Sequence, residues 1–168
     1  MEILGSVPPE PGRTAPCKPA GYQGTWRLTT PALPSSVPRA RHEVRDLMSR
    51  QRVPLTGDRL DGLLLIVSEL VTNAVQHAAL LSPEVAVEVS IGPAWVRVAV
   101  ADDHPCRPRP PAADQERIGG RGLLLVQAIV EEAGGACDVE CTAGGKVVWA
   151  TLPVPPPHPA LTSPPTLR

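Results

Sequence analysis

The most informative stretch of the chain reads Ser68-Glu69-Leu70-Val71-Thr72-Asn73-Ala74-Val75-Gln76-His77-Ala78. Its apolar residues belong to a longer pattern with a period of 3.6 residues, which predicts a helix that begins at Asp58 and ends near Ala78. Glu69, Asn73 and His77 follow one another at steps of four, so they lie along one side of this helix, beside its apolar stripe. Every amphipathic helix has a polar side, so these three residues gain meaning only from what surrounds them.

The rest of the chain predicts an α+β domain with two layers. Alternating apolar residues predict strands at 25–30, 85–91, 96–100, 136–142 and 146–152. Two more helices are expected, one from Ser35 or Ser36 to about Arg52 and one that opens at the glycine cluster 119–122 and ends at Gly134. This order of elements favours an antiparallel or mixed, mostly antiparallel sheet with helices on one face.

Both ends of the chain are rich in proline. We expect residues 1–24 and 155–168 to be disordered, which leaves residues 25–154 as one domain. Lys and Arg number 16 against 17 Asp and Glu, so no charge excess favours nucleic acid or an anionic membrane. The chain contains no apolar run of the length of a membrane span or signal peptide, so a cytoplasmic protein is expected.

Two further motifs accompany the polar row of the long helix. The predicted strand 96–100 leads to Asp102, and Gly120-Arg121-Gly122-Leu123 opens the next helix after a long, proline-rich loop at 103–118. In this order and spacing, the set resembles the Bergerat-fold, histidine-kinase-like ATPases. The segment from Glu69 to Ala78 is similar to their N box, Asp102 to the aspartate of their first glycine box, and the 120–123 motif to their second. The resemblance spans residues 36–153, and within the superfamily it is greatest to the stand-alone anti-sigma-factor serine/threonine kinases.

The resemblance implies a Mg²⁺-ATP site with assigned roles. Asn73 would offer its amide oxygen to Mg²⁺, and Glu69 would accept the proton of an attacking hydroxyl. Asp102 would accept a hydrogen bond from the adenine amino group. The remaining expected nucleotide-binding residues are His77, Gly120, Arg121, Gly122 and Leu123. The loop at 103–118 would be a lid, whose Arg107, Arg109 and Arg117 would reach phosphate or simply remain solvated.

The sequence departs from the family pattern at two positions. Asp102 is followed by Asp103-His104-Pro105-Cys106, where the family has glycines, and Gly145-Lys146-Val147 stands where many relatives have a glycine-threonine pair. A differently shaped adenine pocket is therefore expected, with Lys146 in place of a hydroxyl near the base.

The leading hypothesis is a serine/threonine kinase that phosphorylates an antagonist protein of the anti-anti-sigma type, with a sigma factor as a second partner. A noncatalytic module in which ATP switches protein affinity is the main alternative. A structural domain without nucleotide is a third reading. The sequence leaves open whether the chain forms a homodimer.

Overall fold

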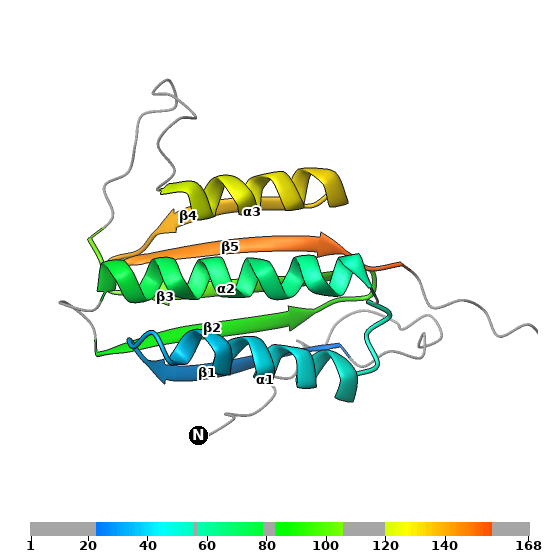
Figure 1. The fold of residues 1–168 in the computed structure, drawn as a ribbon, viewed down its shortest axis with the longest axis horizontal. Coiled ribbons are helices and arrows are strands. Elements are labelled where there is room, and N and C mark those ends of the chain that lie inside the picture. Colours follow the sequence, from blue (N-terminus) through cyan, green and yellow to red (C-terminus); the bar gives the residue numbers. More distant parts are fainter. Residues whose placement is uncertain (1–22, 56, 79–82, 106–119, 156–168) are drawn as a thin grey trace, which may run out of the picture.

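A computed structural model of the protein describes residues 23–55, 57–78, 83–105 and 120–155. Within these residues the chain forms five strands and three helices (Figure 1). The strands are β1 (Gly24–Pro31), β2 (Glu84–Ile91), β3 (Trp95–Asp102), β4 (Ala136–Cys141) and β5 (Lys146–Pro153). The helices are α1 (Ser36–Arg50), α2 (Asp58–Ala78) and α3 (Gly120–Ala133). The types and the order of these elements are those that the sequence predicts.

The strands form one sheet in the order β1-β2-β3-β5-β4. Every pair of described neighbours is antiparallel, which decides between the antiparallel and the mixed sheet expected from the sequence. Because β5 is inserted between β3 and β4, Asp102 at the end of β3 lies directly opposite Lys146 at the start of β5. This register brings together two charged residues that are far apart in the sequence.

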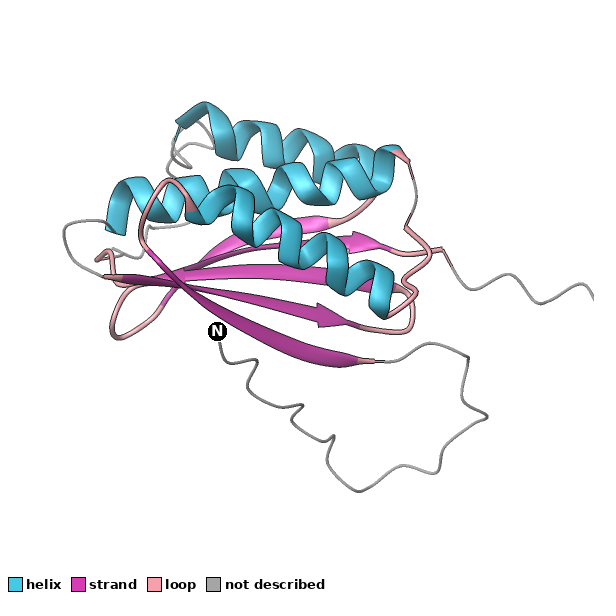
Figure 2. Cartoon of the chain, turned by 60° about the horizontal axis from the view of Figure 1, so that its bottom comes forward, coloured by secondary structure: helices cyan, strands magenta, loops and turns pink. Residues whose placement is uncertain are grey.

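All three helices cover the same face of the sheet (Figure 2). The alternation of apolar residues explains this arrangement, because successive side chains of a strand point to opposite faces. In β2 the buried residues are Val85, Val87, Val89 and Ile91, and the residues between them are partly exposed. The sheet therefore has one apolar face, which the helices remove from water, and the result is the predicted two-layer α+β architecture.

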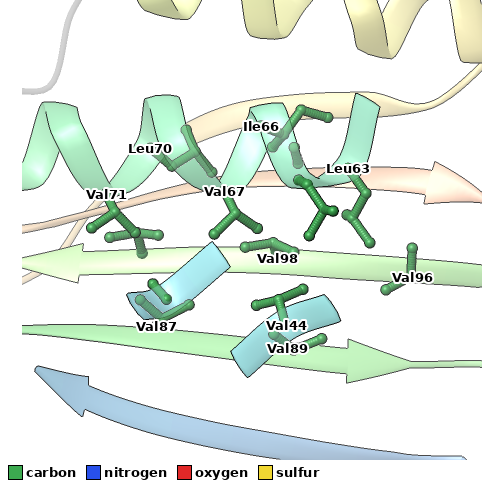
Figure 3. Packing of buried hydrophobic residues seen from close by; sticks show 14 of the residues in the cluster. Val44, Leu63, Ile66, Val67, Leu70, Val71, Val87, Val89, Val96 and Val98 are labelled. Carbon is green, nitrogen blue, oxygen red and sulfur yellow. The ribbon is translucent and has the colours of Figure 1, made fainter. Parts of the chain in front are cut away.

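Helix α2 is the central element of the helical layer, between α1 and α3 and above β2 and β3 (Figures 1 and 3). Its side chains with at most 1% exposure are Leu63, Leu64, Ile66, Val67, Leu70, Val71 and Ala74. This apolar surface is wider than the stripe of an ordinary amphipathic helix, because α2 contacts the sheet and both other helices. Each fully buried Leu, Ile or Val contributes about 1.5–3 kcal/mol. The polar row on α2 is thus carried by the most firmly anchored helix.

The helix ends differ only slightly from the prediction. Asp58, expected as the cap of α2, is its first helical residue, and Gly57 precedes it with a φ of 55°. The Asp58 carboxylate lies at the positive end of the helix dipole, where a negative charge stabilises the helix. Gly134 has a φ of 73°, and the amide of Gly135 donates to the carbonyl of Val130 at 2.8 Å. These glycines end α3, as the sequence predicts.

The expected disordered ends, 1–24 and 155–168, lie almost entirely outside the described residues, as does the loop at 103–118 beyond Pro105. The three lid arginines, Arg107, Arg109 and Arg117, are therefore also outside the described part of the chain. Among the described helices, none combines the length and the apolar character that a membrane crossing requires.

Candidate functional site

Four segments of the motifs meet at one end of the domain. The carboxyl end of α2, the end of β3, the start of α3 and the start of β5 all lie at the left of Figure 1. The antiparallel pairing of β3 with β5 requires the end of one strand to lie beside the start of the other. Residues that are dispersed in the sequence are therefore neighbours here.

Helix α2 contributes the row Glu69, Asn73 and His77. Glu69 and Asn73 are half-buried and His77 is exposed, so the row runs from the helical layer towards solvent. Each step of four residues advances about 6 Å along the helix. The three side chains together span about 12 Å along one side of α2, as the sequence predicts.

Glu69 lies against the start of α3. A Cβ atom added to Gly122 would overlap with Oε2 of Glu69, so the carboxylate can keep its present position only beside a glycine. The next residue, Leu123, is buried and fixes the first turn of α3 to the core, whereas Arg121 is exposed. The structure therefore brings Glu69 and the second glycine motif into direct contact, and Gly120 is the first residue of the helix.

Asp102 is the most deeply buried charged residue of this region, with a side chain that is 1% exposed. Its Oδ1 accepts a hydrogen bond from the backbone amide of His104 at 2.8 Å. Its Oδ2 has no hydrogen-bond partner among the described residues. Lys146 Nζ lies 3.9 Å from Oδ2, close enough for an ion pair but too far for a hydrogen bond.

The surroundings of Asp102 act on its pKa in both directions. Burial raises the pKa of this carboxyl above its ordinary value, because a low-dielectric environment disfavours the charged form. The amide of His104 is the largest opposing influence, followed by the charges of Lys146, His104 and His77. The carboxyl group is thus buried and kept close to several positive or ionisable groups.

The rings of His77 and His104 contact each other edge to face, with their centroids 5.6 Å apart. Burial lowers the pKa of His77, and the charges of Lys146 and His104 lower it further, against the opposite influence of Asp102. His77 therefore belongs to the Asp102 group and not to the Glu69 contact. The sequence motifs did not identify His104 as part of the site; its position two residues after Asp102 in a turn is the signal that could have identified it.

Gly145 explains how Lys146 comes so close to Asp102. A Cβ atom at Gly145 would overlap with the carbonyl oxygen of Asp102 and lie 2.7 Å from Cα of Asp103. A larger residue would separate the start of β5 from the end of β3. The glycine at this position therefore fixes the distance between the two strands at the site.

A two-layer fold with an amphipathic helix that carries Glu and Asn, and with a buried aspartate at the end of a neighbouring strand, is the arrangement expected of a histidine-kinase-like ATPase domain. The model of the histidine kinase-like ATPase domain family matches residues 30–152, so the chain belongs to this family. Membership supports ATP binding and a regulatory, kinase-like role. No curated protein matches the sequence significantly.

Three solved structures of histidine kinases are similar to this chain. The catalytic domain of the histidine kinase ThkA, in a nucleotide-free form, is 17% identical with a TM-score of 0.50, over 78% of this chain and 99% of that one. The mycobacterial sensor histidine kinase MprB is 21% identical with a TM-score of 0.46, over 77% and 100% of the two chains. The histidine kinase domain of the blue-light-activated kinase of Erythrobacter litoralis EL346 is 23% identical with a TM-score of 0.46, over 83% and 66%.

The donor atoms present fit Mg²⁺ bound together with a nucleotide. Among the described residues, no three His, Cys, Asp or Glu side chains are grouped as a metal cage. Mg²⁺ usually keeps several waters and takes only one or two protein oxygens together with substrate phosphates. The amide oxygen of half-buried Asn73 is a donor of the required type.

Proposed function

We propose that this chain binds Mg²⁺-ATP between α2 and the start of α3, and transfers the γ-phosphate to a serine or threonine of another protein. The buried Oδ2 of Asp102, which accepts no hydrogen bond from the described residues, is the observation that carries the proposal. A buried acceptor without a donor costs about 1–3 kcal/mol. The exocyclic amino group of adenine is a donor that would remove this cost, and the adjacent helix α2 carries the residues required for the phosphates.

The phosphates would lie near the start of α3. The free amides of a helix N-terminus attract anions, and Gly120 and Gly122 allow the nucleotide to approach the backbone closely. Arg121 is exposed at the same helix end and supplies a positive charge beside it. Leu123 takes part through its buried side chain, which holds this turn in place.

Asn73 would hold Mg²⁺ through its amide oxygen. When bound, the ion neutralises charge on the phosphate oxygens during transfer. Asn73 lies one helical turn from Glu69 on the same side of α2, so a metal bound there would keep the phosphates close to the Glu69 carboxylate. His77, one turn beyond Asn73, is close to the base-binding aspartate and would line the pocket there.

Glu69 would act as the general base. Its carboxylate accepts the proton of the substrate hydroxyl while the hydroxyl oxygen forms a bond to the γ-phosphorus. The bond between the γ-phosphorus and the bridging oxygen breaks, and ADP leaves with the electron pair. The contact with Gly122 supports this role, because it places the carboxylate at the helix end that is expected to hold the phosphates.

The partner would be an antagonist protein of the anti-anti-sigma type, with a sigma factor as a second partner. This part of the proposal rests on the resemblance of the 68–74 segment to stand-alone anti-sigma kinases. The alternative is a noncatalytic module in which bound ATP changes the affinity for a protein.

Calorimetric titration with ATP, with and without Mg²⁺, tests the binding step. We expect Asn73→Ala to weaken Mg²⁺-ATP binding by about tenfold or more, equivalent to about 1.4 kcal/mol, because the metal loses its protein ligand. Gln76→Ala is the matched control, since this residue is exposed on the same helix. Equal affinities of the wild type and Asn73→Ala would remove Asn73 as the metal ligand.

Labelled ATP tests the transfer step. The protein is incubated with γ-labelled ATP and a kinase-inactivated lysate of the source organism, and the products are treated with acid, which hydrolyses phosphohistidine but spares phosphoserine and phosphothreonine. We expect an acid-stable product that falls about 100-fold or more with Glu69→Gln while ATP affinity is kept. An acid-labile product would contradict serine/threonine transfer, and ATP binding without any transfer would favour the noncatalytic module.

A further inference from the structure

Lys146 lies at the site but has no role in the proposed phosphate transfer. It stands directly across from Asp102 in the pairing of β3 with β5, and directly opposed residues of neighbouring strands lie on the same face of a sheet. The side chain of Lys146 is only 14% exposed, and that of Asp102 is 1% exposed. A lysine ammonium is rarely this buried without a carboxylate partner.

The two carboxylate oxygens of Asp102 have different surroundings. Oδ1 accepts from the amide of His104 at 2.8 Å, while Oδ2 has no hydrogen-bond partner among the described residues. Lys146 Nζ lies 3.9 Å from Oδ2. At this separation the ammonium attracts the negative charge but leaves the lone pairs of Oδ2 available to another donor.

We propose that Lys146 is a positioning residue that keeps Asp102 ionised, so that Oδ2 remains an acceptor for the amino group of the bound base. This inference rests on the proposed nucleotide site. A protonated carboxyl would present a hydroxyl at Oδ2 and could not accept in the same way. Gly145 allows the start of β5 to approach the carbonyl of Asp102, and so keeps the Lys146 ammonium close to the Asp102 carboxylate.

The charges of the two histidines around Asp102 each lower its pKa less than the charge of Lys146 does. His77 faces Asp102 from α2 and His104 from the turn after β3. Burial raises the pKa of Asp102, and positive neighbours oppose this shift. The ammonium of Lys146, on β5, lies 3.9 Å from Oδ2 and is the largest charge influence that lowers the pKa of Asp102.

The inference gives a direction for the effect of pH. Loss of the Lys146 charge removes an influence that lowers the pKa of Asp102, so the pKa of the carboxyl rises further above its ordinary value. The carboxylate exists only above this pKa. Affinity for ATP should therefore fall as the pH falls through it, and the fall should begin at a higher pH without Lys146 than with it.

Lys146→Met removes the charge with little change in side-chain length, and Lys146→Arg retains the charge. The first measurement is a carbon-13 NMR titration of the Asp102 carboxyl in the ligand-free protein. We expect its pKa to rise by about 1 unit or more in Lys146→Met, and to stay near the wild-type value in Lys146→Arg. Lys146→Gln is a second neutral variant for the case in which Lys146→Met does not fold.

The second measurement is the ratio of the ATP dissociation constants of Lys146→Met and wild type from pH 8 to pH 5.5, about the range in which imidazoles titrate. Both proteins contain the two histidines, so the ratio largely removes their contribution. The ratio should rise about tenfold per pH unit between the carboxyl pKa of the variant and that of wild type and level off below both, and Lys146→Arg should give a flat ratio.

The outcomes separate this inference from the proposed function. An unchanged carboxyl pKa in both neutral variants overturns the inference even if wild type binds ATP. Failure of wild type to bind ATP overturns the proposed function, while the carbon-13 titration still decides whether Lys146 keeps Asp102 ionised.

Discussion

At the scale of single residues, the contact between Glu69 and Gly122 makes a sharp prediction. Gly122→Ala would place a methyl group where Oε2 of Glu69 now lies, so the carboxylate must turn away from the start of α3. We expect phosphate transfer to fall about tenfold or more, because a displaced base loses its alignment with the hydroxyl, while ATP binding persists. Transfer and binding are measured as for Glu69→Gln.

A second background isolates the steric effect. In a Glu69→Ala background, Gly122→Ala should have no further effect, since the two residues then no longer meet. An equal loss from Gly122→Ala with and without the Glu69 carboxylate would contradict the proposed contact.

At the scale of the elements, α2 connects the core to the site. Leu70 is 1% exposed and adjoins Glu69 in the sequence. We expect Leu70→Ala to lower the free energy of unfolding by about 2–5 kcal/mol, because it leaves a cavity beneath the helix. Leu33→Ala removes the same atoms from a side chain that is 54% exposed, and should cost less than about 0.5 kcal/mol. Urea denaturation measures both, and equal losses would show that α2 is not the anchored element described here.

Local sequence patterns were sufficient to predict the elements. Alternating valines predicted β2 and β3, and the 3.6-residue period predicted α2, because both patterns follow from the geometry of one element. Glycines 134 and 135 marked the end of α3 for the same reason. The start of α2 was displaced by one residue, since Gly57 takes the turn position that Asp58 was expected to fill.

The inner arrangement of the site was less predictable, because it depends on contacts between distant segments. Glu69, Asn73 and His77 share a helix, so their spacing alone placed them on one side. The approach of Lys146 to Asp102 follows from the insertion of β5 beside β3, which no local pattern encodes. The contact of His104 with His77 likewise depends on how β3 and α2 are stacked. Sequence motifs thus identified the parts of the site but not its electrostatic neighbours.

At the scale of the whole molecule, the proposed site lies at one end of a two-layer domain (Figure 1). A second region at the opposite end, where Leu55, Gly62, Ile129 and Pro153 line a cavity of about 290 Å³, provides an internal reference. Hydrogen exchange monitored by mass spectrometry reports on both ends in one experiment. A ligand that binds at the first end should slow the exchange of backbone amides there and leave the amides at the other end unchanged.

With Mg²⁺-ATP, we expect slower exchange in 69–78, 100–105, 120–126 and 143–148, because these four segments surround the proposed nucleotide. Segments 57–62 and 129–135 should exchange at the rate of the ligand-free protein. Asn73→Ala at the same nucleotide concentration should lose most of the protection, since its occupancy is lower. Protection centred on the opposite end would place the ligand at the second cavity and remove Asp102 as the base-binding residue. Protection shared by all segments would instead indicate a global stabilisation of the fold, and peptides from the two ends distinguish these results directly.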